Sequence, residues 1–198
     1  MIESSDVLSV MKVVYIIYGI IIFSFIGMYA LGISRSKQIL PRIKVPFYGW
    51  IGFLVFVGVG LHLLTYHTIP WVKLDLSRNK VKVDKEFNIS IADYKFQLPD
   101  NKLLIEEDQM VRFNLESKDY TYGFGLFRED GTMLFQMQVV PESRNDIVWK
   151  FNKKANYTIR STEYAGPRGG NLFVKNAVIV ATNAEIAQLI SQKELLQN

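Results

Sequence analysis

The chain has 198 residues and a formal net charge of +4, from 23 basic and 19 acidic side chains, and it contains no cysteine. The lack of cysteine excludes a disulfide framework, a thiolate metal site and a cysteine nucleophile. The small positive excess forms no extended basic block, which argues against nucleic-acid binding. About 130 residues follow the apolar N-terminal third, which is enough for one domain with its own core.

Residues 13–33 and 47–66 form two uncharged apolar runs. Each is close to the roughly 20 residues that an α-helix needs to cross the hydrocarbon layer of a membrane. Two buried helices of a soluble protein would need a polar face or a capped break, and neither run has one. A cleaved signal peptide is disfavoured because Glu3 and Asp6 precede the first run and no Ala-x-Ala site ends it. The sequence therefore predicts a transmembrane hairpin over residues 13–66.

The segment between the two runs, residues 34–46, carries four basic residues and no acidic one. The positive-inside rule predicts that this loop is cytoplasmic, so that residues 1–12 and everything after the second span lie on the outer side. Another basic cluster follows the second span, but it begins a long translocated domain, where the charge rule has little weight. The loop contains Arg35, Lys37, Arg42 and Lys44, and the later cluster contains Lys73, Arg78, Lys80, Lys82 and Lys85.

The second span contains two features that suggest contacts with protein. Gly49, Gly52 and Gly60 share one helical face, and small residues allow helices in a membrane to approach closely. His62 is an ionisable residue at membrane depth, for which a functional role is the default hypothesis. Two roles remain open for His62, a neutral hydrogen-bonded packing residue and a ligand to haem or copper.

After residue 80 the apolar residues recur with a period of two. Phe87, Ile89 and Ile91 form one such series, and further series follow with turn signals such as Pro99-Asp100-Asn101 and Glu129-Asp130-Gly131 between them. This alternation predicts half-buried strands. We expect residues 67–181 to form an all-β sandwich or Greek-key barrel of eight or nine short strands.

The C-terminal segment, residues 182–198, has a helical pattern instead. Thr182-Asn183-Ala184-Glu185 fits a capping box, in which the first and fourth side chains bond each other's backbone N–H groups. Apolar residues follow at helical spacing. These are Ile186, Leu189, Ile190 and Leu195. We expect a C-terminal helix whose apolar stripe packs on the β domain or on a partner.

A two-span hairpin followed by an outer β domain resembles subunit II of the haem-copper oxidases, and two stretches carry the resemblance in residues. Residues 119–126 are similar to the family's run that delivers the first histidine ligand of a dinuclear copper centre. Residues 161–173 are similar to the family's ligand loop of two cysteines, a histidine and a methionine. Tyr122 and Gly169 stand at the histidine positions, Ser161 and Ala165 at the cysteine positions, Leu172 at the methionine position, and Glu163 where a backbone carbonyl would be a ligand.

The resemblance implies a cupredoxin-like fold without its copper. A mixed-valence copper pair needs thiolates and imidazoles, and none of the six positions supplies either. A harder metal held by Glu163, Tyr122 and Ser161 is a weaker alternative, because no second carboxylate joins them. We expect no metal, cofactor-binding or catalytic residue in this chain, and we regard the six positions as a vestigial copper site.

The function that follows from the resemblance is structural. Family members with the copper centre accept electrons from cytochrome c, so its loss implies quinol as donor, with haem and copper in a multi-span catalytic subunit. This chain would support and cap that subunit in the respiratory chain of a bacterial or archaeal cytoplasmic membrane, with oxygen as acceptor.

Two alternatives remain. A nitric oxide reductase of the same superfamily is one, because no carboxylate occurs between Asp6 and Asp75, whereas oxygen reductases of the family often place one near a proton channel. A membrane-anchored β-sandwich binding module with no enzyme attached is the other.

Overall fold

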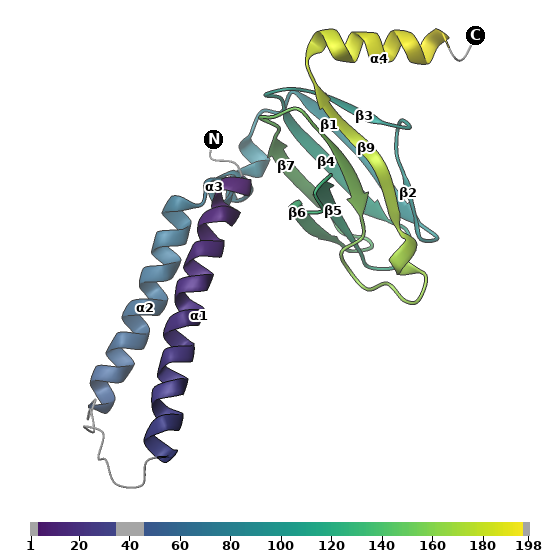
Figure 1. Ribbon diagram of the computed structural model, residues 1–198. Coiled ribbons are helices and arrows are strands. Elements are labelled where there is room, and N and C mark those ends of the chain that lie inside the picture. Colours follow the sequence, from purple (N-terminus) through teal and green to yellow (C-terminus); the bar gives the residue numbers. More distant parts are fainter. Residues whose placement is uncertain (1–3, 35–45, 196–198) are drawn as a thin grey trace. The chain divides into compact units, whose positions relative to one another are not determined.

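The computed structural model describes residues 4–34 and 46–195, and the chain divides into two units, Met1–Pro70 and Trp71–Asn198 (Figure 1). The predicted fold class is confirmed: two apolar helices come first, a β-sandwich follows, and a helix ends the described chain. The predicted cytoplasmic loop comprises residues 34–46, and its residues 35–45, with all four basic side chains, lie outside the described residues.

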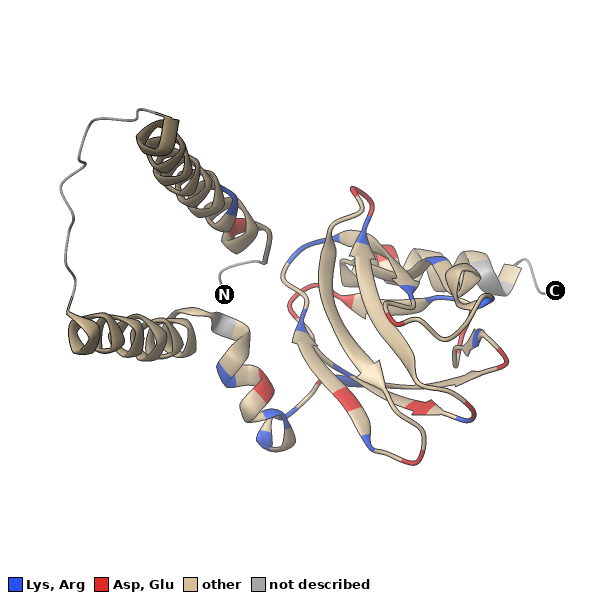
Figure 2. Cartoon of the chain, turned by 90° about the horizontal axis from the view of Figure 1, so that it is seen from below, with Lys and Arg blue, Asp and Glu red and all other residues tan. Residues whose placement is uncertain are grey.

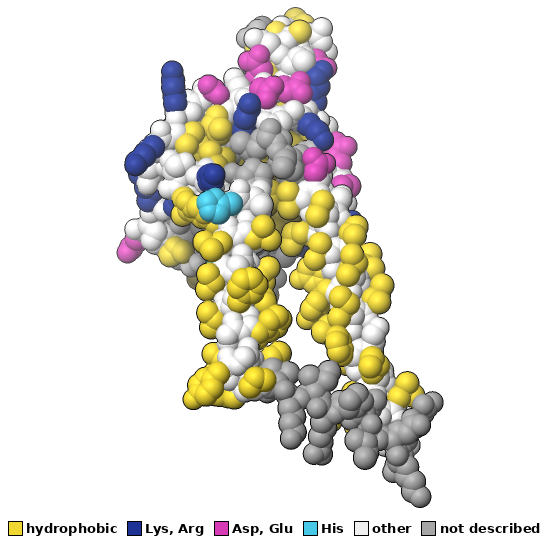
Figure 3. All heavy atoms as spheres, turned by 90° about the vertical axis from the view of Figure 1, so that its left-hand side faces the viewer, with side chains coloured by type: hydrophobic (Ala, Val, Ile, Leu, Met, Phe, Trp, Pro, Cys, Tyr) yellow, Lys and Arg dark blue, Asp and Glu magenta, His cyan; other side chains and the backbone are white. Residues whose placement is uncertain are grey.

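The first unit contains the helices α1 (Ser4–Ser34) and α2 (Phe47–Thr68), and both are long and apolar enough to cross a membrane. Hydrophobic side chains cover both helices along their length (Figure 3). Helix α1 begins nine residues before the predicted start of the first span at Val13, so the polar segment before Val13 is itself largely helical. Helix α2 ends where Ile69 becomes extended, because a residue that precedes a proline disfavours the helical conformation.

Two short helical segments come next. They are α3 (Pro70–Leu76), which belongs to the second unit from Trp71 on, and the 3-10 helix η1 (Arg78–Lys80). Pro70 stands at the first position of α3, where the missing N–H costs nothing. The sequence analysis identified only a basic cluster in this region and predicted no helix here. Charged residues gather on this segment and on the β domain, whereas the two long helices are almost free of charge except near one end of α1 (Figure 2).

Two sheets form the sandwich, one with the strand order β2-β1-β4-β7 and the other with the order β3-β9-β8-β5-β6. The pairs β1–β4 and β3–β9 are parallel, and all other pairs are antiparallel. The strands are β1 (Lys85–Ala92), β2 (Lys95–Gln97), β3 (Leu103–Glu106), β4 (Met110–Ser117), β5 (Tyr122–Arg128), β6 (Met133–Val139), β7 (Asn145–Lys150), β8 (Ala155–Arg160) and β9 (Phe173–Ala181). Nine strands in the described residues agree with the eight or nine that the alternation predicts.

The core lies between the two sheets and is rich in aromatic rings. Phe87, Ile89 and Ile91 of β1 are buried while their neighbours along the strand are more exposed, as the period of two predicts. Phe113 of β4 packs against Phe124 of β5, with ring centroids 5.6 Å apart, and this contact joins the sheets. The inward-facing side chains thus hold the two sheets together.

The C-terminal helix α4 (Asn183–Leu195) begins with the predicted capping box. The backbone N–H and the hydroxyl of Thr182 both donate to a Glu185 carboxylate oxygen, at 2.8 and 2.7 Å, and the Glu185 N–H donates to the Thr182 hydroxyl. These bonds, with a contribution from Lys154, lower the pKa of Glu185 to about 2. The C-terminal part of the apolar stripe of α4 does not pack on the β domain, because Ile190 and Leu195 are exposed.

Candidate functional site

The two stretches that resemble copper-ligand segments meet at one end of the five-stranded sheet. Tyr122 begins β5, Ser161 directly follows β8, and these strands are antiparallel neighbours with Gly125 paired to Arg160. The Ser161 hydroxyl accepts a hydrogen bond from the Gly123 N–H at 3.2 Å. Residues distant in sequence therefore come together here, as the resemblance implies.

Tyr122 is fully buried, and its hydroxyl is held by polar groups of two neighbouring loops. It donates to the Asp119 carboxylate at 3.0 Å and accepts from the Tyr94 N–H at 3.4 Å. Burial, followed by the bond to Asp119, raises the pKa of Tyr122 to about 12. The phenol therefore stays protonated at neutral pH and is a hydrogen-bond donor, not an anionic ligand.

Asp119 is the acceptor of this arrangement. Partial burial raises its pKa, but hydrogen bonds from the N–H groups of Asp93 and Tyr120 and from the Tyr122 hydroxyl outweigh that effect. The pKa of Asp119 is consequently below its ordinary value, and the carboxylate is ionised at neutral pH.

Ser161 closes the start of the loop between β8 and β9. Its hydroxyl donates to the backbone carbonyl of Glu163 at 3.2 Å, and its N–H donates to the carbonyl of Leu172 at 2.9 Å. The side chain of Glu163 is exposed, whereas Leu172 is buried in the core. The carbonyl of Glu163, at the position expected for a backbone ligand, is thus already an acceptor within the loop.

The remaining two positions supply no donor side chain. Gly169 begins the 3-10 helix η2 (Gly169–Asn171), and a Cβ at Gly169 would lie 3.7 Å from the Cβ of Ala165. The positions that resemble a cysteine and a histidine ligand are therefore adjacent in space, and the residues present there are apolar.

Thr162, Gly123 and Gly125 were not identified from the sequence, although they fix the loop on β5. A Cβ at Gly123 would lie 2.6 Å from the N atom of Glu163, and one at Gly125 would lie 2.6 Å from Cγ2 of Thr162. Alternate glycines within a strand indicate that another backbone approaches closely, and that signal was present in the sequence. Neither glycine can gain a methyl group unless the loop moves.

Three tyrosine rings, those of Tyr94, Tyr120 and Tyr122, lie close together. The ring centroids of Tyr94 and Tyr122 are 5.9 Å apart, those of Tyr120 and Tyr122 6.3 Å, and those of Tyr94 and Tyr120 5.8 Å. The guanidinium carbon of Arg168 lies 4.9 Å from the centre of the Tyr94 ring, a cation–π geometry. Ring contacts and a cation–π contact thus connect Tyr122 to Tyr94, Tyr120 and Arg168.

The donor set does not fit a dinuclear copper centre. Such a centre needs bridging thiolates and imidazoles, and the six positions offer a protonated phenol, a hydroxyl already bonded within the protein, an exposed carboxylate and three apolar residues. In the described parts of the chain, no three side chains of His, Cys, Asp or Glu lie close enough to hold a metal ion. The expectation that this chain binds no metal stays a prediction.

His62 lies outside this site, in α2. Its Nδ1 atom is 3.0 Å from the carbonyl oxygen of Gly58, one turn earlier in the same helix. Both roles that the sequence left open for His62 stay untested.

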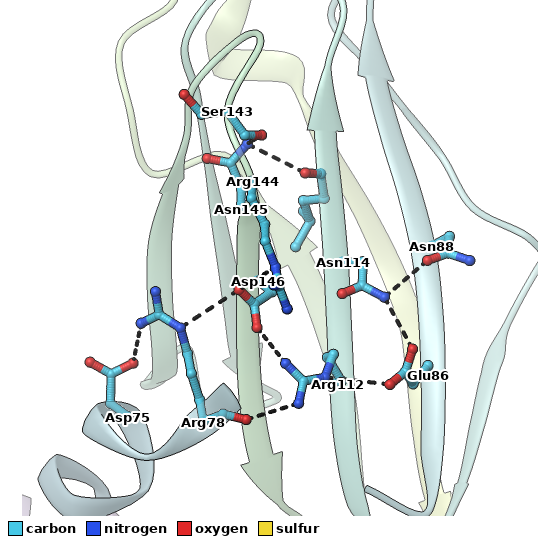
Figure 4. A network of polar contacts seen from close by, with 11 residues as sticks. Asp75, Arg78, Glu86, Asn88, Arg112, Asn114, Ser143, Arg144, Asn145 and Asp146 are labelled. Carbon is cyan, nitrogen blue, oxygen red and sulfur yellow. Dashed lines mark hydrogen bonds and ion pairs between the residues drawn. The ribbon is translucent and has the colours of Figure 1, made fainter. Parts of the chain in front are cut away.

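A second polar cluster lies on the outer face of the four-stranded sheet (Figure 4). Arg112 of β4 donates to the Asp146 carboxylate of β7 at 2.6 Å and to the backbone carbonyl of Arg78 at 2.9 Å. Asp146 also lies 3.6 Å from Arg78 and 3.5 Å from Arg144. These contacts attach the segment after α2 to the sheet. They could not be predicted from the sequence, because polar residues on the outer side of a strand normally face water.

Comparisons with known proteins give matches only among solved structures. No family model matches the chain, and no curated protein matches it. The periplasmic domain of subunit II of cytochrome oxidase of Bradyrhizobium japonicum is 15% identical, with a TM-score of 0.44, over 57% of this chain and 94% of that chain. A heme-copper terminal oxidase dimer is 17% identical, with a TM-score of 0.48, over 68% of this chain and 97% of that chain. Auracyanin B is 9% identical, with a TM-score of 0.43, over 51% of this chain and 91% of that chain. Likeness at this level assigns no function.

Proposed function

We propose that this chain is a copper-free, non-catalytic subunit II of a quinol-dependent haem-copper terminal oxidoreductase that reduces oxygen in a respiratory chain. The observation that supports this most directly is the convergence of Tyr122 with the loop at residues 161–172. Two stretches that resemble ligand segments of one known centre are brought together by the fold, yet they carry none of its ligands.

The chemistry of the site determines the route of electrons in this proposal. Tyr122 is a neutral phenol and Ser161 a hydroxyl bonded to Gly123 and Glu163, so neither holds copper in the way that imidazole and thiolate do. Cytochrome c then has no entry point through this chain. Quinol oxidised within the catalytic subunit supplies the electrons instead, and the haems and copper belong to that subunit.

The role of this chain is to anchor its β domain in the membrane and to cover the outer side of the catalytic subunit. Helices α1 and α2 span the cytoplasmic membrane of a bacterium or archaeon and pack against the multi-span catalytic subunit. The β domain and both termini lie on the extracytoplasmic side, where the domain caps the haem-bearing subunit and restricts access from outside.

Nitric oxide is the second candidate acceptor. It is favoured by the absence of any carboxylate between Asp6 and Asp75, the part of the chain that would otherwise offer one to a proton channel. The remainder of the proposal is the same for both acceptors.

The test is purification of the affinity-tagged chain from its own membranes in a mild detergent. The proposal predicts that haem absorbance elutes with the chain, and that the complex consumes oxygen when a reduced quinol is added. Consumption of nitric oxide but not oxygen would select the second candidate. A chain that elutes without haem would contradict the subunit role and favour a membrane-anchored binding module.

A further inference from the structure

The segment that joins the second apolar helix to the β domain is strongly basic. Residues 71–85 contain five basic and two acidic side chains, a net charge of +3. Lys73, Lys80 and Lys82 are exposed and make no ion pair with another described residue. In the proposed topology this charge lies on the outer side of the membrane, where it does not serve as a positive-inside signal.

The inner side of the same segment is fixed to the sandwich. The rings of Trp71 and Trp149 have centroids 6.1 Å apart, and the carbonyl of Arg78 accepts the bond from Arg112 described above. The Arg78 side chain bonds Asp75 at 2.9 Å (Figure 4). The charged outer side is therefore held in a defined place and is not a freely moving tail.

An amphipathic hollow lies beside this segment. It has a volume of about 610 Å³ and is bounded by Trp71, Val72 and Leu76 of α3 on one side and by residues of β6 and β7, including Phe135 and Trp149, on the other. Arg144, with a side chain that is 71% exposed, stands at its edge. Leu76 is 70% exposed although it is a large apolar residue, and it follows Lys73 by three positions, on the same side of the helix.

We propose that this basic and apolar surface binds an anionic phospholipid of the outer leaflet, with the phosphate beside Lys73, Lys80 and Lys82 and an acyl chain against Leu76 and the hollow. The proposal rests on the membrane anchoring in the proposed function. Only Ile69 separates α2 from α3, so a spanning α2 delivers α3 to the depth of the lipid headgroups. Phosphate is the abundant anion there, and basic residues next to a span are attracted to it. Leu76 is apolar and exposed, so it can contact the first part of an acyl chain of the same lipid.

The test uses the full chain alone, in nanodiscs of phosphatidylcholine or of phosphatidylcholine with about one third phosphatidylglycerol. Because the protein has no cysteine, Asn79→Cys introduces a unique site for a nitroxide label, and Asn79 is exposed between Arg78 and Lys80. The ratio of collisions with oxygen to collisions with a water-soluble nickel chelate reports whether the label faces lipid or water.

We expect this ratio to rise several-fold in the anionic discs. In the variant Lys73→Gln/Lys80→Gln/Lys82→Gln we expect the preference for the anionic lipid to fall by about 10-fold or more, and high salt to weaken it in the unchanged protein. The matched control Lys95→Gln/Lys102→Gln/Lys175→Gln removes the same charge from exposed positions elsewhere in the β domain and should retain the response.

Three outcomes would overturn the proposal. The first is a label equally accessible to water in both lipids, and the second is an equal loss of response in both triple variants. The third is a label that becomes shielded only when the chain is in the haem-containing complex, whatever the lipid, which would assign the surface to an acidic protein partner. The comparison of the two lipids uses the chain alone and does not depend on whether haem elutes with it, so this test and that of the subunit role fail separately.

Discussion

Replacement of Asp146 by asparagine should destabilise the β domain far more than loss of an exposed carboxylate. The side chains of Asp146 and Arg112 are 3% and 8% exposed, and their closest N–O distance is 2.6 Å. Asparagine keeps the shape and removes the charge, which leaves three arginines around a neutral group. The structural change is small, so the effect should report electrostatics and not packing.

The loss of stability in this variant depends on the charged groups that remain near Arg112. Removing one partner of a buried ion pair costs about 3–5 kcal/mol, because the other charge stays buried. Glu86 lies 3.4 Å from Arg112 and is about half exposed, so it compensates only in part. We therefore expect a loss of about 3 kcal/mol, near the lower end of the range. For a domain of this size, about 4 °C of melting temperature corresponds to each kcal/mol, so Tm should fall by about 12 °C.

The assay is thermal unfolding of the full chain in a mild detergent, followed by tryptophan fluorescence, since Trp71 and Trp149 lie beside the network. Asp108→Asn is the control. Asp108 pairs with Lys150 at 3.1 Å but its side chain is 71% exposed, so its loss should cost at most about 1 kcal/mol. Equal shifts in Tm for the two variants would refute the reasoning that burial determines the cost.

Three further predictions concern the site and the C-terminal helix. Tyr122→Phe removes the bond to Asp119 and should cost about 1 kcal/mol in chemical denaturation, whereas Tyr120→Phe, whose ring is half exposed, should cost little. Gly123→Ala should lower the free energy of unfolding by about 1–3 kcal/mol, because the loop must move. Gly170→Ala should be tolerated, because a Cβ there meets open space. A Gly123→Ala variant of unchanged stability would show that the loop is not held on β5. The pKa of Glu185 is lowered in the folded chain, so its contribution to α4 is present above about pH 4.5 and is lost as pH falls through about 2. Hydrogen exchange of the first α4 amides should accelerate over that interval and lose this dependence in Glu185→Gln.

The sequence predicted those parts of the fold that depend on local pattern. Alternation at Phe87, Ile89 and Ile91 specifies the inner face of a strand because side chains point to opposite sides in turn. The capping box at Thr182 and Glu185 likewise involves residues three positions apart, and the structure contains its bonds. Such signals need no knowledge of distant segments.

Features that depend on long-range pairing were not predicted. Arg112 and Asp146 are 34 positions apart and lie on the outer faces of their strands, where a polar residue gives no sign that another segment covers it. The short helix α3 was missed because seven residues carry too little periodicity. Tyr94 enters the site from a tight turn in which its φ is +59°, and no local signal directs it to Tyr122.

The candidate site was found by resemblance and not by geometry. Tyr122, Ser161 and Leu172 were identified because they occupy positions of a known motif, and the structure places them within one connected set of contacts. The residues that hold this set together, Thr162 and Gly123 among them, have no counterpart in that motif. The resemblance selected these positions, and the structure gave the contacts between them.

We propose that, in the complex that contains this chain, electrons reach the haems without passing through the chain. The most direct measurement is the rate of haem reduction in the purified complex, recorded by stopped-flow absorbance after mixing with a reduced quinol or with reduced cytochrome c. The account predicts rapid reduction by the quinol and none by cytochrome c on the same time scale. Rapid reduction by cytochrome c would contradict it.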